Sequence, residues 1–140
     1  MSDILDATRW VVATLAGDAT LASLAKVYSG IAPAGVAYPH IIVLSTSPHD
    51  ELTFNANKIR MTDIVAVRAV CEGESYAPLE AIADRVYTLL HQQSGPVPTK
   101  TTRVAECFGL EPIMYPEFDD TTSKSYRHLG HLYQLSVVED

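Results

Sequence analysis

Apolar side chains recur every three or four positions over residues 2–16, the spacing that places them on one face of an α-helix. Ser2 is the expected N-terminal cap of this helix, and Gly17 is a typical stop. Asp18 then offers a side-chain cap to a second, short helix. Residues 26–28 begin an extended stretch, so the start of the chain predicts two helices followed by a strand.

The middle of the chain predicts two strands joined by a polar loop. Residues 31–39 contain two prolines and a glycine, which exclude a helix and predict a turn. Residues 40–45 are apolar at successive positions, as is typical of a strand buried on both faces. Residues 59–72 alternate in polarity, and the length of this strand predicts a bend or bulge near residues 62–63. The intervening residues 46–58 are polar and turn-rich, which favours a loop.

The last part of the chain predicts one helix and two strands. The helix covers residues 77–92, with Pro78 in its first turn. Strands are expected over residues 101–110 and 126–138, separated by an acidic loop at residues 111–125. Because the strands come in adjacent pairs, the order predicts an α+β domain. We expect a mostly antiparallel β-sheet with two main helices packed on it and long polar loops.

Length and charge narrow the class of protein. The 140 residues, 47% of them apolar, are enough for a single domain over residues 1–140 with one core. The net charge is −7, and the ten basic residues form no run, so we expect neither a duplex-DNA grip nor binding to an anionic membrane. No apolar run is long enough to span a bilayer. Acidic residues at the N-terminus lead us to expect no export signal.

Cysteine and histidine spacing predicts no metal site. Cys71 and Cys107 lie 36 positions apart without a CxxC partner, so we expect two buried, reduced thiols. His128 and His131 have an odd separation in a predicted strand, which sends their side chains to opposite faces. They therefore cannot bind one metal ion together.

Motifs for catalysis and cofactor binding are also missing from the sequence. The adjacent acids at residues 119–120 are expected to be solvated in a loop, and the run Ser-Pro-His-Asp at residues 47–50 is too local for a catalytic triad. The sequence has no GxGxxG, P-loop or HExxH motif. We therefore predict no catalytic, cofactor-binding or metal-binding residues, no cofactor and no enzyme.

Large apolar side chains occur in two of the predicted polar loops. Phe54 lies in the first, and Met114 and Tyr115 lie in the second. Exposed aromatic residues of this kind are often buried at a protein–protein interface. The alternative is that they pack back on their own domain.

A resemblance emerges from the order of the elements. Residues 32–41 read Ala-Pro-Ala-Gly-Val-Ala-Tyr-Pro-His-Ile, and they lie between an N-terminal helix and a strand. A polar excursion, a long strand ending Val-Cys-Glu at residues 70–72, a helix and a final strand follow. This arrangement resembles the tail-terminator (tail-completion, head–tail joining) proteins of long-tailed bacteriophages.

The resemblance implies a structural role in a virion. Proteins of this kind assemble six to a ring on the last layer of the tail tube, stop its polymerisation and present the surface that docks onto the filled head. The implied partners are further copies of the chain, the tail tube protein and a head connector or neck protein. The implied location is the tail of the virion, and the bacterial host cytoplasm during assembly. DNA would pass through the lumen of the ring without specific binding, and the negative net charge would repel it.

Position within the family assigns the interface to the two predicted loops, residues 46–58 and 111–125. Within them we expect Glu51, Phe54 and Tyr115 to contact the neighbouring subunit or the tube.

Three alternatives remain open at this point. The first is another head–tail connector or neck ring subunit. The second is a small α+β oligomeric enzyme or ligand-binding protein with a pocket that uses Tyr133, His131 or Tyr87. The third is a stand-alone bacterial scaffold domain.

Overall fold

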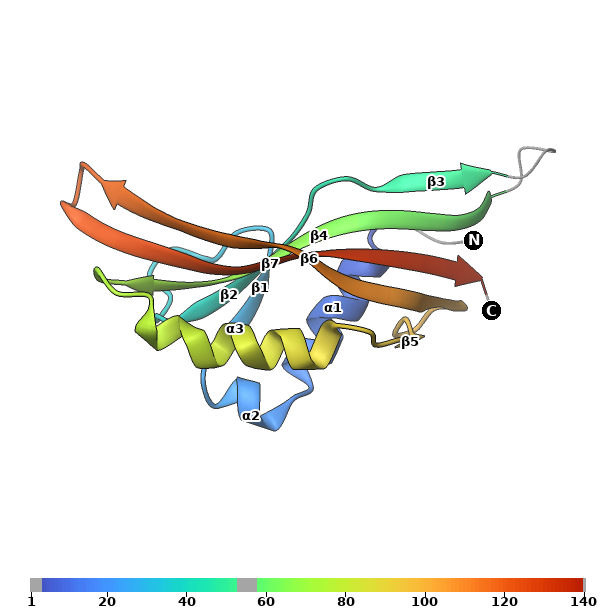
Figure 1. Cartoon of the computed structure of the whole chain (residues 1–140), viewed down its shortest axis with the longest axis horizontal. Helices are drawn as coiled ribbons and strands as arrows, with labels where there is room; N and C mark the ends of the chain where they lie inside the picture. The colour runs from blue at the N-terminus through green and yellow to red at the C-terminus, as the bar shows by residue number, and fades with distance from the viewer. Residues whose placement is uncertain (1–3, 53–57, 140) are drawn as a thin grey trace.

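A computed structural model describes residues 4–52 and 58–139. It contains one curved sheet with helices packed against one of its faces (Figure 1). In chain order the elements are α1 (Asp6–Ala16), α2 (Ala19–Ala22), β1 (Lys26–Ser29), β2 (His40–Ser45), β3 (His49–Leu52), β4 (Lys58–Glu72), α3 (Ala77–Leu90), β5 (Gly95–Pro96), β6 (Thr102–Asp119) and β7 (Lys124–Glu139). Within the described ranges, no helix has both the length and the apolar character needed to cross a bilayer.

The sheet confirms the predicted α+β class. Its strand order is β1-β2-β4-β7-β6-β5, and β3 pairs separately with β4. The pair β1–β2 is parallel, and the other pairs in the described chain are antiparallel. The long strands β4 and β7 pair without interruption over residues Arg60 to Glu72 of β4, so they form the central pair of the sheet.

The core lies between the sheet and the helices α1 and α3. Residues at alternate positions of β4 and β7 point into it, as the polarity pattern predicts. Burying one such large side chain contributes roughly 1.5–3 kcal/mol. Buried side chains of this core include Trp10, Val11 and Leu15 of α1, Leu79, Ile82 and Leu90 of α3, Val65 and Val67 of β4, and Tyr133, Leu135 and Val137 of β7.

The ends of the first two helices are only partly as predicted. Helix α1 begins at Asp6, after Leu5, which makes no side-chain cap. The expected cap, Ser2, lies outside the described residues. Gly17 follows the last residue of α1 as predicted.

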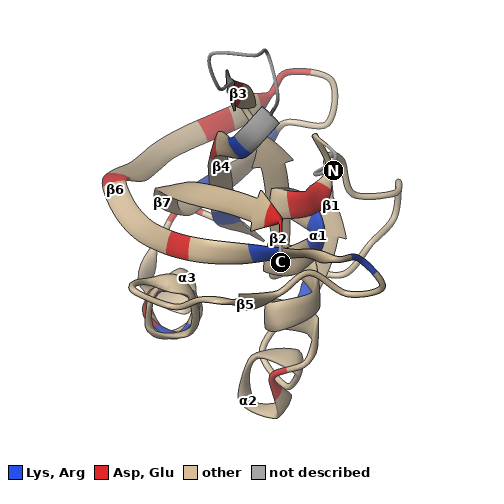
Figure 2. Cartoon of the chain, turned by 90° about the vertical axis from the view of Figure 1, so that its right-hand side faces the viewer, with Lys and Arg blue, Asp and Glu red and all other residues tan. Residues whose placement is uncertain are grey.

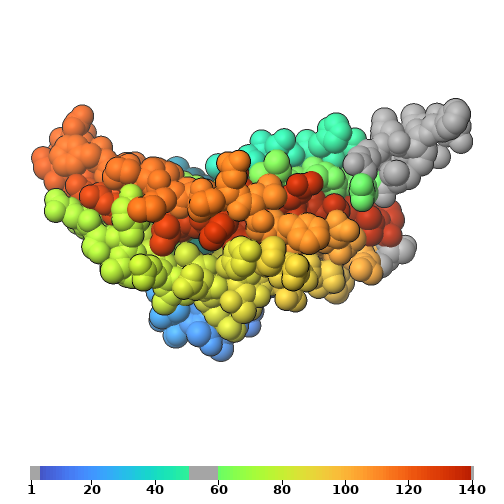
Figure 3. All heavy atoms as spheres, in the orientation of Figure 1, coloured from blue at the N-terminus to red at the C-terminus, as the bar shows by residue number. Residues whose placement is uncertain are grey.

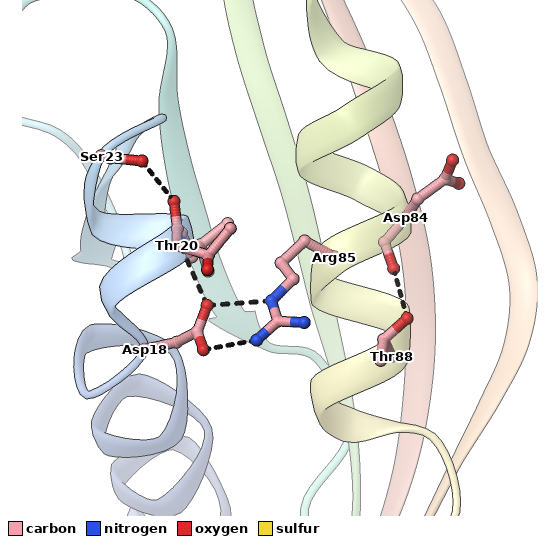
Figure 4. Close-up of polar contacts among 7 residues, drawn as sticks. Asp18, Thr20, Ser23, Asp84, Arg85 and Thr88 are labelled. Atoms are coloured by element: carbon pink, nitrogen blue, oxygen red, sulfur yellow. Dashed lines mark hydrogen bonds and ion pairs between the residues drawn. The ribbon is translucent and has the colours of Figure 1, made fainter.

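Asp18 caps α2 as the sequence predicts, and it also ties α2 to α3. Its carboxylate accepts a hydrogen bond from the main-chain N–H of Leu21 at 2.9 Å. The same carboxylate accepts two bonds from Arg85 of α3, at 3.0 Å from Nε and 2.7 Å from Nη2 (Figure 4). These bonds, that from Arg85 first, lower the pKa of Asp18. One side chain therefore joins two helices that lie far apart in the sequence.

The segment predicted as a loop at residues 46–58 contains a strand. Residues 49–52 form β3, which pairs with the first part of β4. The predicted bulge near residues 62–63 is wrong, since β4 pairs with β7 there in unbroken register. The irregularity lies in the β3–β4 pairing, between Glu51 and Leu52. Long-range pairing with β4 orders a segment whose composition alone favours a loop.

The prediction of an acidic loop at residues 111–125 is also wrong. Strand β6 continues to Asp119, a short turn follows, and β7 begins at Lys124. The β6–β7 register shifts twice, between Val104 and Glu106 and between Gly109 and Pro112. The end of β6 and the start of β7, residues 110–126 with the turn between them, lie at one end of the sheet, and we call them the ribbon (Figures 1 and 3). Beyond the pair of Glu117 with Tyr126, where β4 ends, only these two strands continue. Both segments predicted as long polar loops, residues 46–58 and 111–125, therefore contain strand residues.

Prolines explain the mistaken loop. Pro112 and Pro116 normally indicate a break, because proline lacks the N–H that a strand donates to its neighbour. Both lie in β6, which pairs with β7 on one side and, over these residues, with no described strand on the other. An edge strand tolerates proline when its missing N–H would have faced outward.

Candidate functional site

The structure separates Glu51 from Tyr115, two of the three residues that the sequence assigned to an interface. Tyr115 lies in the ribbon, opposite His128 of β7. Glu51 lies in β3, where its main chain is opposite Arg60 of β4. His128 is itself opposite Val70 of β4, so the two places are ten residues apart along that strand, about 33 Å at the usual rise. Phe54 lies outside the described residues.

Tyr115 stacks on a buried histidine. Its ring lies 4.3 Å from the ring of His128, with 11° between the planes. The tyrosine is 39% exposed, whereas His128 is only 5% exposed. Tyr115 therefore covers His128 from the solvent side of the open sheet face, which is the face without helices.

His128 bridges a base and an acid. Its Nε2 lies 2.7 Å from Oε1 of Glu117, and because a carboxylate only accepts, Nε2 carries the proton. Its Nδ1 accepts a bond of 3.2 Å from Nε of Arg68. Burial lowers the pKa of His128, against the opposing effect of Glu117, and the charge of Arg68 lowers it further. The imidazole is thus held neutral in one tautomer.

A groove opens beside this histidine on the open face. It has a volume of about 510 Å³ and lies between the proline-rich segment 31–38 and the strands β2, β4, β6 and β7. Rings line one side of it: Tyr38 lies 4.8 Å from His40 and 5.5 Å from Tyr126, between ring centroids. Burial is the main cause that raises the pKa of Tyr38. Charged and imidazole side chains make up much of its lining, so the groove is more polar than the mostly apolar pockets that bind small molecules.

The charges in the groove nearly balance. Arg68 and Lys124 line it together with three acids, Glu72, Glu117 and Asp119. Lys124 lies 3.6 Å from Glu72, and Glu117 is connected to Arg68 through His128. The groove therefore lacks the excess of one charge that would select a strongly charged small molecule.

The residues of the enzyme alternative lie on the other face of the sheet. His131 and His128 occupy opposite faces of β7, as their odd separation predicts, and His131 lies 5.0 Å from Tyr87 of α3 between ring centroids. Tyr133 is fully buried, and burial raises its pKa. These rings pack on one another in the core, and within the described chain the Tyr133 hydroxyl has no hydrogen-bond partner.

The cysteines are buried as predicted and form no disulfide. Burial raises the pKa of Cys71, and it raises that of Cys107 to about 12, so neither is activated as a nucleophile. Within residues 4–52 and 58–139, no three histidine, cysteine or acidic side chains gather as metal ligands would.

The ribbon carries an exposed apolar row that the sequence analysis had assigned to a loop. Met114 is 64% exposed and Phe118 is 59% exposed. With Pro112 and Pro116 they occupy alternate positions of β6 and so share one face of the ribbon. Apolar residues at every second position do indicate a strand here, but the two prolines among them led to the prediction of a loop.

Comparisons with known proteins place the chain by fold alone. It matches no family model, and no curated protein matches its sequence. Among solved structures it is similar to a chain of the "Virion of native gene transfer agent (GTA) particle", with a TM-score of 0.67 over 91% of each chain and 16% sequence identity. The α+β architecture, with helices on one face of a long-stranded sheet, is thus shared with that chain over nearly its whole length.

Proposed function

We propose that this protein is a structural component of a phage-type virion. In this role it forms a ring on the head-proximal end of the tail tube, stops tube polymerisation and provides the surface for head–tail joining. The observation that carries the proposal is the likeness in fold to a chain of a gene transfer agent virion, which extends over 91% of both chains. The resemblance in element order to tail-terminator proteins supports the same role.

The shape of the subunit supports assembly with other proteins. The ribbon and the β3–β4 end extend in opposite directions from the helical body (Figure 3). Apolar side chains on the ribbon are exposed, and buried apolar surface is the main driving force of association. A subunit with contact surfaces at two ends is suited to a ring.

A ring also accounts physically for termination. One face of the ring can complement the last layer of the tube, while its other face presents a different surface. A head-to-tail contact that does not repeat the tube surface cannot propagate. In this account the end of the tube is defined by shape, and no reaction is required.

The experiment is native mass spectrometry of the purified protein over a concentration series, with negative-stain images of the same samples. We expect a closed ring of six subunits with a central hole, either free or after addition of tail tubes from the phage or agent that encodes the chain. Binding at one end of the tubes and an arrest of their growth would support the termination role. A tight dimer, or a monomer that ignores tube ends, would contradict it.

A further inference from the structure

The exposed apolar row of the ribbon has no covering element in the described chain. We call Pro112, Met114, Pro116 and Phe118 the ribbon stripe. Met114 and Phe118 are more than half exposed, although side chains of this size are usually buried. The stripe runs along β6 toward the hairpin end of the sheet, where Phe118 lies beyond the last residue of β4 that pairs with β7. A protruding apolar stripe of this kind marks a contact surface.

A complementary groove lies on the first helix. Leu5, Val12 and Ala13 of the α1 segment and Pro98 of the β5–β6 connection line an apolar groove of about 390 Å³, which we call the α1 groove. Thr8 also lines it, and its hydroxyl is buried without a hydrogen-bond partner in the described chain.

The stripe and the groove lie at different ends of the molecule. Figure 1 shows the ribbon at one end and the β5–β6 connection at the other, near the two termini, and Figure 2 shows this second end with α1 beside the connection. The ribbon therefore cannot fill the groove of its own chain. Two copies placed head to tail can bring one stripe to one groove.

Charge favours the same pairing. Residues 110–126, which contain the stripe, carry four carboxylates and one lysine, Lys124, which is itself paired with Glu72. The groove has one basic lining side chain, Arg9, and Lys100 is the next residue in sequence after Thr99, which also lines it. Arg9 also pairs with the buried Asp6 at 3.0 Å, yet its side chain is 38% exposed. Acidic ribbon and basic rim would attract each other over the last few ångströms of approach.

We propose that the ribbon stripe of one copy docks in the α1 groove of the next copy. This inference rests on the proposed ring and names its subunit contact. Met114 and Phe118 enter the groove, where they contact the apolar side chains of Leu5, Val12 and Pro98. The contact joins two different surfaces, so repetition around an axis gives a closed ring without a second kind of contact.

Cysteine cross-linking between two single variants tests the contact directly. Phe118→Cys and Ala13→Cys are purified separately with different tags, mixed and oxidised. We expect a disulfide-linked heterodimer of one chain of each kind. The matched control mixes Phe118→Cys with Leu24→Cys, which is 39% exposed after α2 and away from the groove, and should give little cross-link.

Charge substitution tests the energetic role of the stripe. The double variant M114D/F118D should raise the protein concentration needed for assembly at least tenfold, while its circular dichroism and melting curve stay close to wild type. The control variant L24D, at another exposed leucine, should assemble like wild type.

The outcomes separate the contact from the proposed function. A ring that forms in M114D/F118D as in wild type, without the cross-link, overturns the contact and leaves the ring. A specific cross-link in a protein that gives only open chains and never binds tube ends supports the contact and contradicts the proposed function. A wild-type chain that stays monomeric at millimolar concentration, gives no cross-link with or without tail tubes and does not bind tube ends overturns both.

Discussion

His128 shows how a single buried side chain can make stability depend on pH. Burial is the main cause that lowers the pKa of His128 and keeps the ring neutral, and the charge of Arg68 adds to it against the opposing effect of Glu117. In this state Arg68 donates to Nδ1 and Nε2 donates to Glu117, with Tyr115 stacked on the ring. Protonation at Nδ1 would remove the bond from Arg68 and bring two cations together. The groove on the open face, which includes all of these groups except Tyr115, would rearrange as a result.

We expect stability to fall as pH decreases from the ordinary histidine value of 6.5 through the lowered pKa of His128. In this window the unfolded chain binds more protons than the folded chain, so the free energy of unfolding rises with pH. His40 and His131 have pKa values lowered by burial and contribute in the same direction. H128Q should therefore reduce the slope without abolishing it. Urea unfolding at pH 5–8 measures this slope, the change of the free energy of unfolding with pH. His49→Gln, at an exposed histidine, is the control. Equal slopes in H128Q and wild type would contradict the expectation.

Asp18 is a second residue that stabilises more than its own element, because it caps α2 and also binds Arg85 of α3. D18N should lower Tm by a few degrees, because it weakens both the cap of α2 and the paired bonds from Arg85. Asp84, an acid on α3 whose carboxylate points away from this pair in Figure 4, supplies the control D84N. The effect of D18N should vanish as pH falls through the lowered pKa of Asp18, since the protonated acid no longer holds Arg85 as an ion pair. If D18N and D84N have the same Tm at pH 7, Asp18 does not stabilise the fold in this way.

At the scale of elements, the pairing of β4 with β7 organises the fold. The two strands are paired over thirteen successive positions, and β2, β3 and β6 attach to them. Gly130 lies at the centre of this pair, opposite Arg68. A Cβ at this position would meet the main chain of Val67 and would lie 2.7 Å from Cα of Arg68. The close approach of two main chains therefore requires glycine here.

G130A should lower the free energy of unfolding by about 3 kcal/mol, since the clash is with main chain that cannot rotate away. G95A is the control, because its added Cβ would meet only the indole Nε1 of Trp10, at 3.3 Å, and should cost below about 1 kcal/mol. Equilibrium urea unfolding of both variants makes the measurement. A G130A protein as stable as wild type would mean that the strands can separate there without penalty.

At the scale of the whole molecule, charge bears on the proposed channel. The net charge of −7 comes from seventeen acids and ten bases, and acids and bases alternate over the end of the molecule in Figure 2 without forming one basic patch. A protein that grips duplex DNA uses clustered lysine and arginine to release counterions. A ring of such subunits would let DNA slide through its lumen.

We therefore expect the purified protein to show no binding to duplex DNA in electrophoretic mobility shifts at about 50 mM salt, up to tens of micromolar protein. Binding that weakens steeply as salt is raised would contradict the expectation. A weak mobility shift that does not change with salt would not come from phosphate contacts, so it would not contradict the expectation.

Much of the local structure followed from the sequence alone. The stop of α1 at Gly17, the Asp18 cap, the strand at residues 40–45 and the helix with Pro78 in its first turn all depend on neighbours within a few positions. The opposite faces of His128 and His131 follow from the two-residue period of a strand. Such features need no knowledge of which distant segment lies alongside.

Tertiary structure decided the rest, and the reason is long-range pairing. Residues 49–52 become a strand only because β4 lies beside them, and Pro112 and Pro116 fit a strand only because β6 is at the edge over those residues. The bonds of His128 to Arg68 and of Asp18 to Arg85 join residues 60 and 67 positions apart. The sequence thus determined the fold class and the local elements, while the ribbon, the groove and the distance between Glu51 and Tyr115 emerged only when the sheet brought distant segments together.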